Sequence, residues 1–413
     1  MDIYIVEYNC LNKYYFKMSK YLKLFENHTQ YETFIGGGGD TQFVRPNVSH
    51  CIEENEVHYN PIIHDYSKDY LTFVALGNTT FSFTNTISYS SDNGQNWTEG
   101  NSVTVNGGDK VLWKGELTPF SNNGIGTFSS TGQFDVQGNI MSLLYGDDFD
   151  GQTDLTGKNY AFYNLFRGND KLINAKNLIL PATTLATQCY EYMFGECENL
   201  ISAPVLPAET MARECYYGMF YYCESLKTAP ELPATTLANY CYGYMFCGCS
   251  SLTIVPTTLP AETLAQYCYY WMFDRCTSLT TAPTLPATTL ATQCYYNMFN
   301  GCTSLTTVQS ELPATTLENS CYYRMFHYCS NLTTAPILPA ATLVDSCYYD
   351  MFRGCTSLNS ITCLATTISA SNCTTNWVYD VPSGGTFTKA DGASWSTGTS
   401  GIPSGWTVET ATE

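Results

Sequence analysis

The chain carries little charge, and positive charge is scarcest of all. Only 13% of the 413 residues are Asp, Glu, Lys or Arg, and 18 Lys and Arg stand against 37 Asp and Glu, a formal charge of −19. A general nucleic-acid binder needs a basic surface to displace counterions, so this balance argues against that class and against docking on anionic lipid. No apolar run approaches the ~20 residues of a membrane helix.

Signals for export and for catalysis are also missing. The N-terminal segment lacks the ordered basic, apolar and small-residue regions of a signal peptide, whether translation starts at Met1 or at Met18. No G-x-S-x-G, Walker, H-E-x-x-H or Rossmann glycine pattern occurs. We therefore predict a protein without enzymatic activity.

Two clusters of potential metal ligands stand out against this background. The first is formed by His50, Cys51, His58 and His64, whose spacing matches no standard zinc pattern. The second is formed by Asp147, Asp148, Asp150 and Asp154. These aspartates would suit a calcium site, a pair of glycosidase carboxylates or a solvated loop. We expect the solvated loop, with no cofactor and no bound metal, and a glycoside hydrolase remains a minor alternative.

What the chain has instead is an internal repeat rich in aromatic residues. The pattern C-Y-x-x-M-F-x-x-C begins at residues 189, 215, 241, 268, 294, 321 and 347, so the copies recur every 26 or 27 residues. A degenerate copy, AFYNLFRGNDKL, opens the series at residues 161–172 and makes about eight units. A repeat of this length predicts a solenoid, in which each unit buries its apolar face against its neighbours.

Each unit is expected to form a short strand and a helix. Leu305 and the two threonines after it predict an extended segment, and Pro286 ends the equivalent segment of the preceding unit. Thr289 is a candidate N-cap for a helix over Leu290–Phe299, and Thr315–Glu318 has the spacing of a capping box. The sequence therefore predicts an α/β repeat solenoid.

The constant residues of the repeat are expected to be its buried face. At 100° per residue, Cys294, Tyr295, Met298 and Phe299 share one side of the predicted helix. The two cysteines of one unit would lie about 12 Å apart, too far for a disulfide. We therefore expect free, buried thiols that act as small hydrophobic side chains.

The variable residues are expected to face outward beside a row of tyrosines. Tyr, Trp and Arg dominate binding hot spots, and an indifferent helix surface would instead favour good helix formers. We predict that a ligand binds here, at Tyr192, Tyr217, Tyr221, Tyr244, Tyr270, Trp271, Asp274, Tyr296, Asn297, Tyr323, Arg324, His327, Tyr349, Asp350 and Arg353. Two alternatives remain open. In the first, exposed residues vary because nothing selects them, and the stacked tyrosines stabilise the solenoid by packing alone. In the second, the ligand binds the concave strand face, which is built from Thr280, Thr281, Thr306 and Thr307.

The units CTSLTTAP–LP and MFxGCxSL resemble the BspA-like leucine-rich repeats of bacterial surface proteins. The copy at 161–172 is most similar to the family form, and the later copies differ by Met in place of Ala and by an added Cys-Tyr. The resemblance covers about half of the chain and implies a leucine-rich-repeat solenoid associated with adhesion and contact with host surfaces. The flanks resemble segments of surface or virion proteins of gut Bacteroidetes and their phages.

Four regions are predicted along the chain. Residues 1–65 form an N-terminal segment, and 66–150 a small all-β, sandwich-like domain with one Asp-box hairpin at Ser90–Trp97. Residues 151–364 form the solenoid, and 365–413 a C-terminal cap with a Gly/Ser/Thr-rich tail.

The predicted function is recognition of a carbohydrate or protein receptor on a cell surface. A phage virion protein, which needs no export signal, competes with a secreted or surface-anchored bacterial adhesin, and a purely structural spacer is a third alternative. The expected location is accordingly a virion or the cell surface. Homo-oligomerisation or assembly into a virion is compatible with the sequence, whereas nucleic-acid binding and membrane insertion are not expected.

Overall fold

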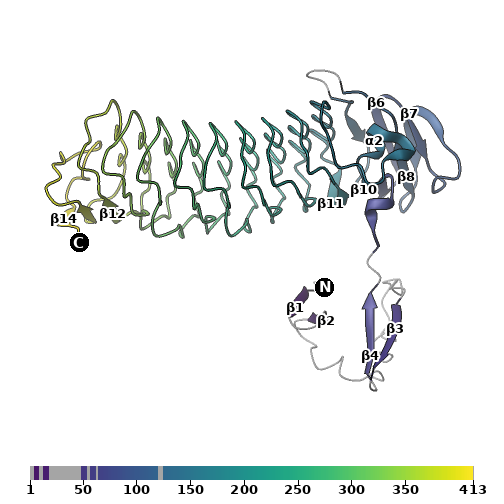
Figure 1. Cartoon of the computed structure of the whole chain (residues 1–413), viewed down its shortest axis with the longest axis horizontal. Coiled ribbons are helices and arrows are strands. Elements are labelled where there is room, and N and C mark those ends of the chain that lie inside the picture. Colours follow the sequence, from purple (N-terminus) through teal and green to yellow (C-terminus); the bar gives the residue numbers. More distant parts are fainter. Residues whose placement is uncertain are drawn as a thin grey trace. The chain divides into compact units, whose positions relative to one another are not determined.

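The computed structural model describes residues 64–119 and 124–412, together with the backbone of four strands nearer the N-terminus. The chain divides into two compact units, Met1–Asp65 and Tyr66–Glu413 (Figure 1). The first unit contains two antiparallel hairpins, formed by β1 (Tyr4–Tyr8) with β2 (Lys13–Lys17) and by β3 (Val48–Glu53) with β4 (Glu56–Pro61). The side chains of the first predicted metal cluster, His64 excepted, lie outside the described residues.

The second unit begins with a mainly antiparallel sheet. A 3-10 turn, η2 (Tyr66–Lys68), precedes its strands β5 (Leu71–Ala75), β6 (Thr79–Ser90), β7 (Thr98–Val105), β8 (Lys110–Lys114), β9 (Phe128–Ser130) and β10 (Phe134–Asn139). The strand order is β11-β10-β5-β8-β6-β7, with β9 paired to β6. These strands belong to one sheet, whereas a sandwich would place two sheets face to face. Buried aromatic rings, among them Phe73, Phe81 and Trp113, form its core.

The predicted Asp-box occupies the hairpin between β6 and β7. Ser90 donates its hydroxyl hydrogen to Asp92 Oδ1 at 2.7 Å, and the backbone N–H of Gly94 donates to Ser90 Oγ at 2.9 Å. The hydrogen bonds that Asp92 accepts from Asn96 and from the Ser90 hydroxyl lower the pKa of Asp92 to about 2. The loop is thus closed by its own side chains, which is the structural role of the motif.

The predicted helices of the repeats are absent, and this expectation was wrong. Among the described residues the only α-helix is α2 (Ser142–Tyr145), followed by the 3-10 turn η3 (Gly146–Asp148). Each repeat instead contains a ten-residue run of turns. Nine such turn segments follow one another in the described part of the chain, and we number the coils 1–9 by them: 159–168, 187–196, 213–222, 239–248, 266–275, 292–301, 319–328, 345–354 and 371–380.

Backbone hydrogen bonds explain why the segment forms turns. In coil 6 the N–H groups of Tyr295, Asn297 and Phe299 donate to carbonyls of coil 7 at 2.8–3.0 Å. The residues between them donate three residues back within the coil, as Met298 does to Tyr295 at 3.2 Å. An α-helix would turn every N–H inward to residue i−4 and leave the coils without bonds between them. The turns therefore satisfy the backbone hydrogen-bonding groups and also join each coil to the next.

Columns of aromatic rings fill the solenoid between these ladders. The phenylalanines from Phe166 to Phe352 stack coil upon coil with centroids 5.4–5.8 Å apart and ring planes within 11° of each other. A second column begins at Phe162, continues through the first tyrosine of each motif, and ends at Trp377. Each such pair adds about 0.5–1.5 kcal/mol to the free energy of unfolding beyond simple burial.

The cysteines are free and buried, as predicted. This holds for all seventeen cysteines among the described residues. In coils 2–8 the second thiol of each motif donates to the carbonyl of the column phenylalanine one coil earlier at 3.0–3.2 Å, as Cys302 does to Phe273. A thiol is small enough to fit this position and supplies a donor for a carbonyl inside the core.

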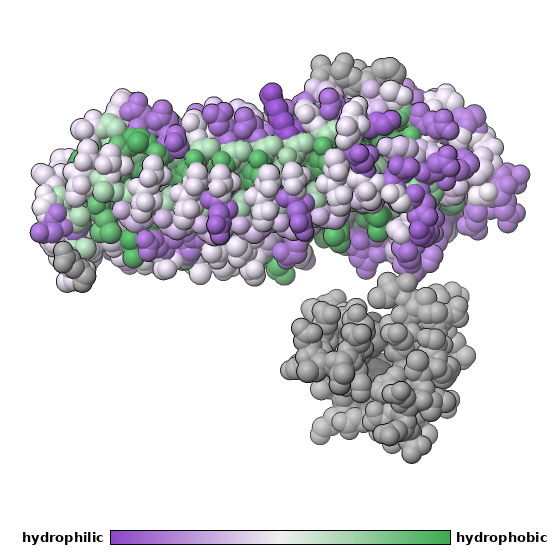
Figure 2. Space-filling view, in the orientation of Figure 1, coloured by the Kyte–Doolittle hydropathy of each residue, from purple (hydrophilic) through white to green (hydrophobic). Residues whose placement is uncertain are grey.

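The surface of the solenoid reflects the low charge of the sequence. On the face that Figure 2 shows, a hydrophobic band runs lengthwise over the coils, and much of the surrounding surface is close to neutral in hydropathy. The strongly hydrophilic residues of that view are scattered along the solenoid and are more frequent over the sheet.

The C-terminal residues close the last coil. Coil 9 is a degenerate copy in which Trp377 replaces the motif methionine, so the solenoid extends beyond the predicted residue 364. The N–H of Asn376 donates to Ser400 Oγ at 3.0 Å and that of Val378 to the Thr399 carbonyl at 3.2 Å. Strands β12 (Ser360–Cys363), β13 (Thr386–Lys389) and β14 (Thr407–Thr410) pair in parallel beside it. The segment thus supplies bonding partners that a tenth coil would otherwise provide.

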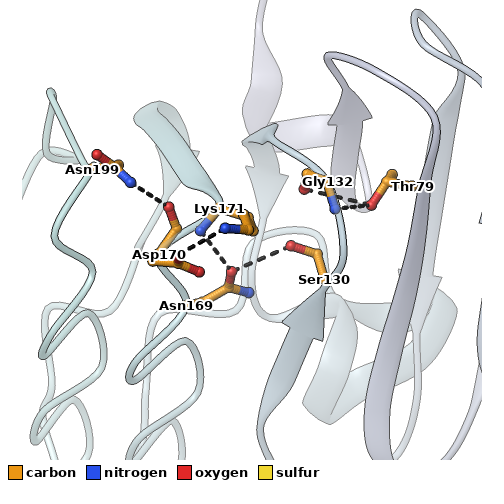
Figure 3. A network of polar contacts seen from close by, with 7 residues as sticks. All are labelled: Thr79, Ser130, Gly132, Asn169, Asp170, Lys171 and Asn199. Atoms are coloured by element: carbon orange, nitrogen blue, oxygen red, sulfur yellow. Dashed lines mark hydrogen bonds and ion pairs between the residues drawn. The ribbon is translucent and has the colours of Figure 1, made fainter.

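The first coil is joined to the sheet by β11 (Leu172–Ile179), which pairs in parallel with β10. Figure 3 shows the polar contacts at this junction. Asn169 bonds to Ser130 at 3.3 Å and accepts the N–H of Lys171 at 3.2 Å, while Asn199 of the next coil donates to the Asp170 carbonyl at 2.8 Å. The sheet and the solenoid therefore share one core and form one unit.

Candidate binding surface on the turn face

The turn segments together form one surface of the solenoid, which we call the turn face. Twelve of the fifteen predicted binding residues are partly exposed on it: Tyr192, Tyr217, Tyr221, Tyr244, Tyr270, Trp271, Tyr296, Tyr323, Arg324, His327, Tyr349 and Arg353. Asp274, Asn297 and Asp350 are only 1% exposed, so the prediction that these three lie on the outer surface was wrong. Asp274 and Asp350 instead bond to side chains of adjacent coils, Asn300 and Arg324.

The backbone of the turn face is left-handed at every fourth residue. In coil 6, Gln293, Asn297 and Gly301 have φ of 55°, 54° and 70°, and the equivalent residues of the other coils follow the same pattern. A left-handed conformation costs an L-residue roughly 1–2 kcal/mol, and only Gly, Asn and Asp adopt it readily. Trp271 and Arg324 nevertheless occupy it, with φ of 54° and 52°. Bulky side chains thus stand where the backbone alone would favour small ones.

The exposed tyrosines form a continuous row along the turn face. From Tyr270 to Tyr349 their ring centroids are 4.4–5.1 Å apart in successive coils, and the last three rings are almost parallel. In coils 2–4, Tyr192, Tyr217 and Tyr244 contact one another edge to face at 5.4–5.6 Å. The row presents partly exposed hydroxyls and ring edges over several coils.

Buried carboxylates hold the guanidinium groups of the turn face. Asp350 Oδ2 accepts a hydrogen bond from Arg324 Nε at 2.9 Å and forms an ion pair with Arg324 Nη2 at 2.9 Å, and Asp350 Oδ1 lies 3.7 Å from Arg353 Nη1. Asp274 accepts a bond from Asn300 and lies 3.7 Å from Arg275. Burial raises the pKa of Asp274. Both aspartates therefore act as internal supports of cationic side chains rather than as ligand contacts.

A pocket of about 250 Å³ lies over coil 6, and we call it the coil 6 notch. Its lining comes from three successive coils. Trp271 and Arg275 belong to coil 5, Asn297, Asn300 and Gly301 to coil 6, and Arg324, His327 and Tyr328 to coil 7. Four of these residues were predicted as binding residues and are brought together here. In the notch, Asn297 and Gly301 of coil 6 lie between larger side chains of coils 5 and 7.

The other four lining residues, Arg275, Asn300, Gly301 and Tyr328, were missed. Arg275, Gly301 and Tyr328 occupy the position before the second motif cysteine, which holds Glu, Tyr, Gly or Arg in different copies. That variability was a usable signal.

Protonation at the notch is set by burial. His327 Nδ1 lies 2.6 Å from Asn300 Oδ1, and burial together with the nearby Arg324 lowers the pKa of His327 to about 4. The imidazole is therefore neutral at pH 7. The positive charge at the notch comes from guanidinium groups alone.

The predicted aspartate cluster does not form a common site. Asp147 accepts bonds from Lys114 and from the Tyr70 hydroxyl at 2.7 Å, whereas Asp150 pairs with Lys68. Asp154 accepts the N–H of Thr156, and these bonds lower the pKa of both Asp147 and Asp154. Across residues 64–119 and 124–412, no group of three or more His, Cys, Asp or Glu side chains is placed to hold a metal ion.

The rival strand face is also present. Thr281 pairs with Thr307 in a parallel bridge, and Thr280 and Thr306 beside them are exposed. No helix in the described part of the chain is long and apolar enough to cross a membrane.

Comparisons with known proteins place the repeat in a family. The model for the BspA type leucine rich repeat region matches in six copies over residues 158–280 and 244–376, which together span more than half of the chain. A search of curated proteins found no match. A solved leucine-rich repeat protein from Bacteroides ovatus is 18% identical, with 63% of this chain and 81% of that one covered and a TM-score of 0.26.

The repeats of such proteins generally mediate protein interactions, and the proteins are typically found at cell surfaces or secreted. The family match confirms the resemblance read from the motifs, over the same part of the sequence. The chain belongs to the BspA-type leucine-rich-repeat family.

Proposed function

We propose that this chain is a non-catalytic recognition protein that binds a carbohydrate or protein receptor on a cell surface through the turn face. Family membership supports contact with surfaces in general, and the turn face supplies the specific hypothesis.

The observation that carries the proposal is the occupancy of the left-handed positions. Trp271, Tyr244 and Arg324 adopt φ of 52–54°, where Gly, Asn or Asp would cost less. A residue in an unfavourable backbone conformation is retained where its side chain has a role that Gly, Asn or Asp does not fill. Aromatic and guanidinium groups at these positions are also the side chains that dominate binding hot spots.

The repeat suggests how binding is built up. Tyrosine rings pack on sugar rings or apolar side chains, while Asn and Arg bond to hydroxyl and carboxylate groups. Each coil contributes a modest contact, and several adjacent coils acting on one receptor raise the overall affinity. Such a surface suits a virion protein and a bacterial adhesin equally.

The test is binding of the labelled full chain to intact gut-bacterial and epithelial cells. A turn-face variant carries Tyr270→Ser, Tyr296→Ser and Tyr323→Ser, and it leaves the Arg324–Asp350 pair intact. A matched strand-face variant carries Thr281→Ala and Thr307→Ala. Both variants must unfold cooperatively on heating before they are compared.

Loss of binding in the turn-face variant alone supports the proposal, and the cell type bound separates a virion protein from an adhesin. Loss in the strand-face variant alone moves recognition to the threonine surface and overturns the proposal. No binding by the unmodified chain favours the spacer alternative.

A further inference from the structure

The coil 6 notch differs from coils 4 and 8 in what covers its glycine. Gly248 and Gly354 occupy the same position as Gly301 in their coils, and a tyrosine of the preceding coil lies over each of them. A Cβ at Gly248 would lie 2.8 Å from the Tyr222 ring, and one at Gly354 would lie 2.3 Å from the Tyr328 ring.

At Gly301 the preceding coil supplies Arg275 instead of a tyrosine. A Cβ there would be 3.6 Å from the nearest atom, Arg275 Cγ. At coil 6 no ring occupies the place that a tyrosine fills in coils 4 and 8, and Gly301 is only in van der Waals reach of Arg275. We propose that the notch binds one carboxylate-bearing sugar ring, such as a uronic acid residue of a surface glycan. This inference rests on the proposed function and names the ligand class for the same surface.

Two buried polar atoms at the notch lack hydrogen-bond partners among the described residues. Asn297, which is 1% exposed and lines the notch, has no hydrogen bond to its Oδ1. Trp271 Nε1 is likewise buried without an acceptor. A buried polar group without a partner destabilises the fold, and a bound water, ion or ligand that supplies the missing hydrogen bond removes that penalty. One of these atoms needs a donor and the other an acceptor, and a sugar hydroxyl provides both.

The charge of the notch favours an acidic sugar over a neutral one. Between residues 241 and 364 the only basic side chains are Arg275, Arg324 and Arg353, and all three lie on the turn face. Asp274, Asp345 and Asp350 balance these three arginines in the turn segments of coils 4–8. The notch itself is lined by Arg275 and Arg324 and by no carboxylate, so its lining is cationic in a chain of −19.

The guanidinium groups at the notch also keep donors free. Arg275 is 61% exposed and donates one bond, from Nη1 to the Tyr222 hydroxyl at 2.8 Å. Arg324 uses Nε and Nη2 on Asp350. A guanidinium has five N–H donors, so both arginines can still bind a carboxylate.

An acidic protein side chain fits these observations less well. An ionised Asp or Glu only accepts hydrogen bonds and would leave Asn297 Oδ1 without a donor. It also lacks the ring that would fill the space over Gly301. A volume of about 250 Å³ is below the usual range for drug-sized ligands and suits a single sugar ring.

The experiment measures binding of methyl β-D-glucuronide to the full chain by ligand-observed NMR titration. Methyl β-D-glucoside is the neutral match, and glutarate is the carboxylate without a ring. Arg275→Gln removes the charge and keeps the space open. Arg275→Tyr places over Gly301 the residue that already covers Gly248 and Gly354, so this variant is expected to fold. Arg213→Gln removes an exposed arginine of coil 3 as the control.

We expect saturable binding of the glucuronide, at least tenfold weaker binding of the glucoside and of glutarate, and no change in Arg213→Gln. Arg275→Gln should weaken glucuronide binding at least tenfold, and Arg275→Tyr should abolish it. Equal binding of the two glycosides, glutarate binding as strong as that of the glucuronide, or binding that survives in Arg275→Tyr overturns the inference. So does the lack of any saturation at about 10 mM probe, beyond the range of weak specific binding.

Cell binding distinguishes this failure from failure of the proposed function. If glucuronide does not bind but the triple tyrosine variant still loses cell binding, the turn face remains the receptor surface and only the assignment of the notch is wrong.

Discussion

The ring of Tyr192 lies directly over Gly218 of the next coil. A Cβ at Gly218 would be 2.3 Å from Tyr192 Cε1, and Gly218 has φ of 58°. Gly218→Ala should therefore lower the free energy of unfolding by about 2–4 kcal/mol, from steric overlap and the left-handed backbone together. Gly301→Ala, with φ of 70° and no contact shorter than 3.6 Å, should lose only about 1 kcal/mol. Chemical denaturation of both variants checks this, and equal losses would contradict the open notch.

The left-handed row predicts opposite effects of glycine at two adjacent residues. Gln293 has φ of 55° and its side chain makes no hydrogen bond among the described residues, whereas Thr292 is not left-handed. Gln293→Gly should leave stability unchanged or raise it by up to about 1 kcal/mol, because relief of the backbone offsets the added entropy of the unfolded chain. Thr292→Gly should lower it by about 0.5–1 kcal/mol. The thermal unfolding midpoints of the two variants test this prediction. A loss of stability in Gln293→Gly as large as that in Thr292→Gly would contradict the left-handed backbone at Gln293.

Glu191 predicts a loss of stability with rising pH. Burial raises the pKa of Glu191 from 4.5 to about 7, although Gln188 donates a hydrogen bond to it at 2.6 Å. The folded chain thus holds this proton more tightly than the unfolded chain, so the contribution is full below pH 4.5 and is lost as pH rises through 7. The loss amounts to roughly 3 kcal/mol.

Glu191→Gln keeps the hydrogen bond and removes the ionisation. Denaturation at pH 5 and at pH 8 should show the variant gaining stability over the unmodified chain mainly at pH 8. The same difference at both pH values would mean that Glu191 does not titrate as stated.

The buried thiols should resist alkylation in the native state. Burial raises the pKa of Cys189 and Cys294 to about 12, and the thiolate is the reactive form. Iodoacetamide at pH 8 should leave the cysteines from Cys189 to Cys373 unmodified, and labelling should follow only after unfolding. Peptide mapping by mass spectrometry reads the result. Fast labelling of any cysteine between Cys189 and Cys373 would show that the coils open locally.

The sequence determined the solenoid and most of its core. The fixed spacing of Cys, Met and Phe identified the buried residues, because a repeat can bury the same side chains only by stacking equivalent positions. It also indicated free thiols, since equivalent cysteines recur in every coil and none has a unique partner. Twelve of the fifteen predicted surface residues were placed on the turn face for the same reason.

The sequence also contains a pattern that argues against the predicted helix in each repeat. Cys294, Met298 and Cys302 recur with a strict period of four, as do Tyr295 and Phe299. A helix of 3.6 residues per turn would drift by 40° at each such step, whereas successive turns of the same length keep the period. Periods of 3.6 and of four residues differ little over ten residues, so the pattern was compatible with a helix although the segment forms turns.

Only the tertiary structure decided the backbone and the notch. Whether a backbone N–H bonds within its own coil or to the next coil depends on the position of the neighbouring coil. Local sequence propensity carries no information about that neighbour. Asp274 and Asp350 are buried for the same reason, since each is covered by side chains of adjacent coils. The space over Gly301 depends on Arg275, twenty-six residues earlier, standing where other coils have tyrosine. Such a contact exists only once the coils are stacked, because stacking makes residues one repeat apart into neighbours.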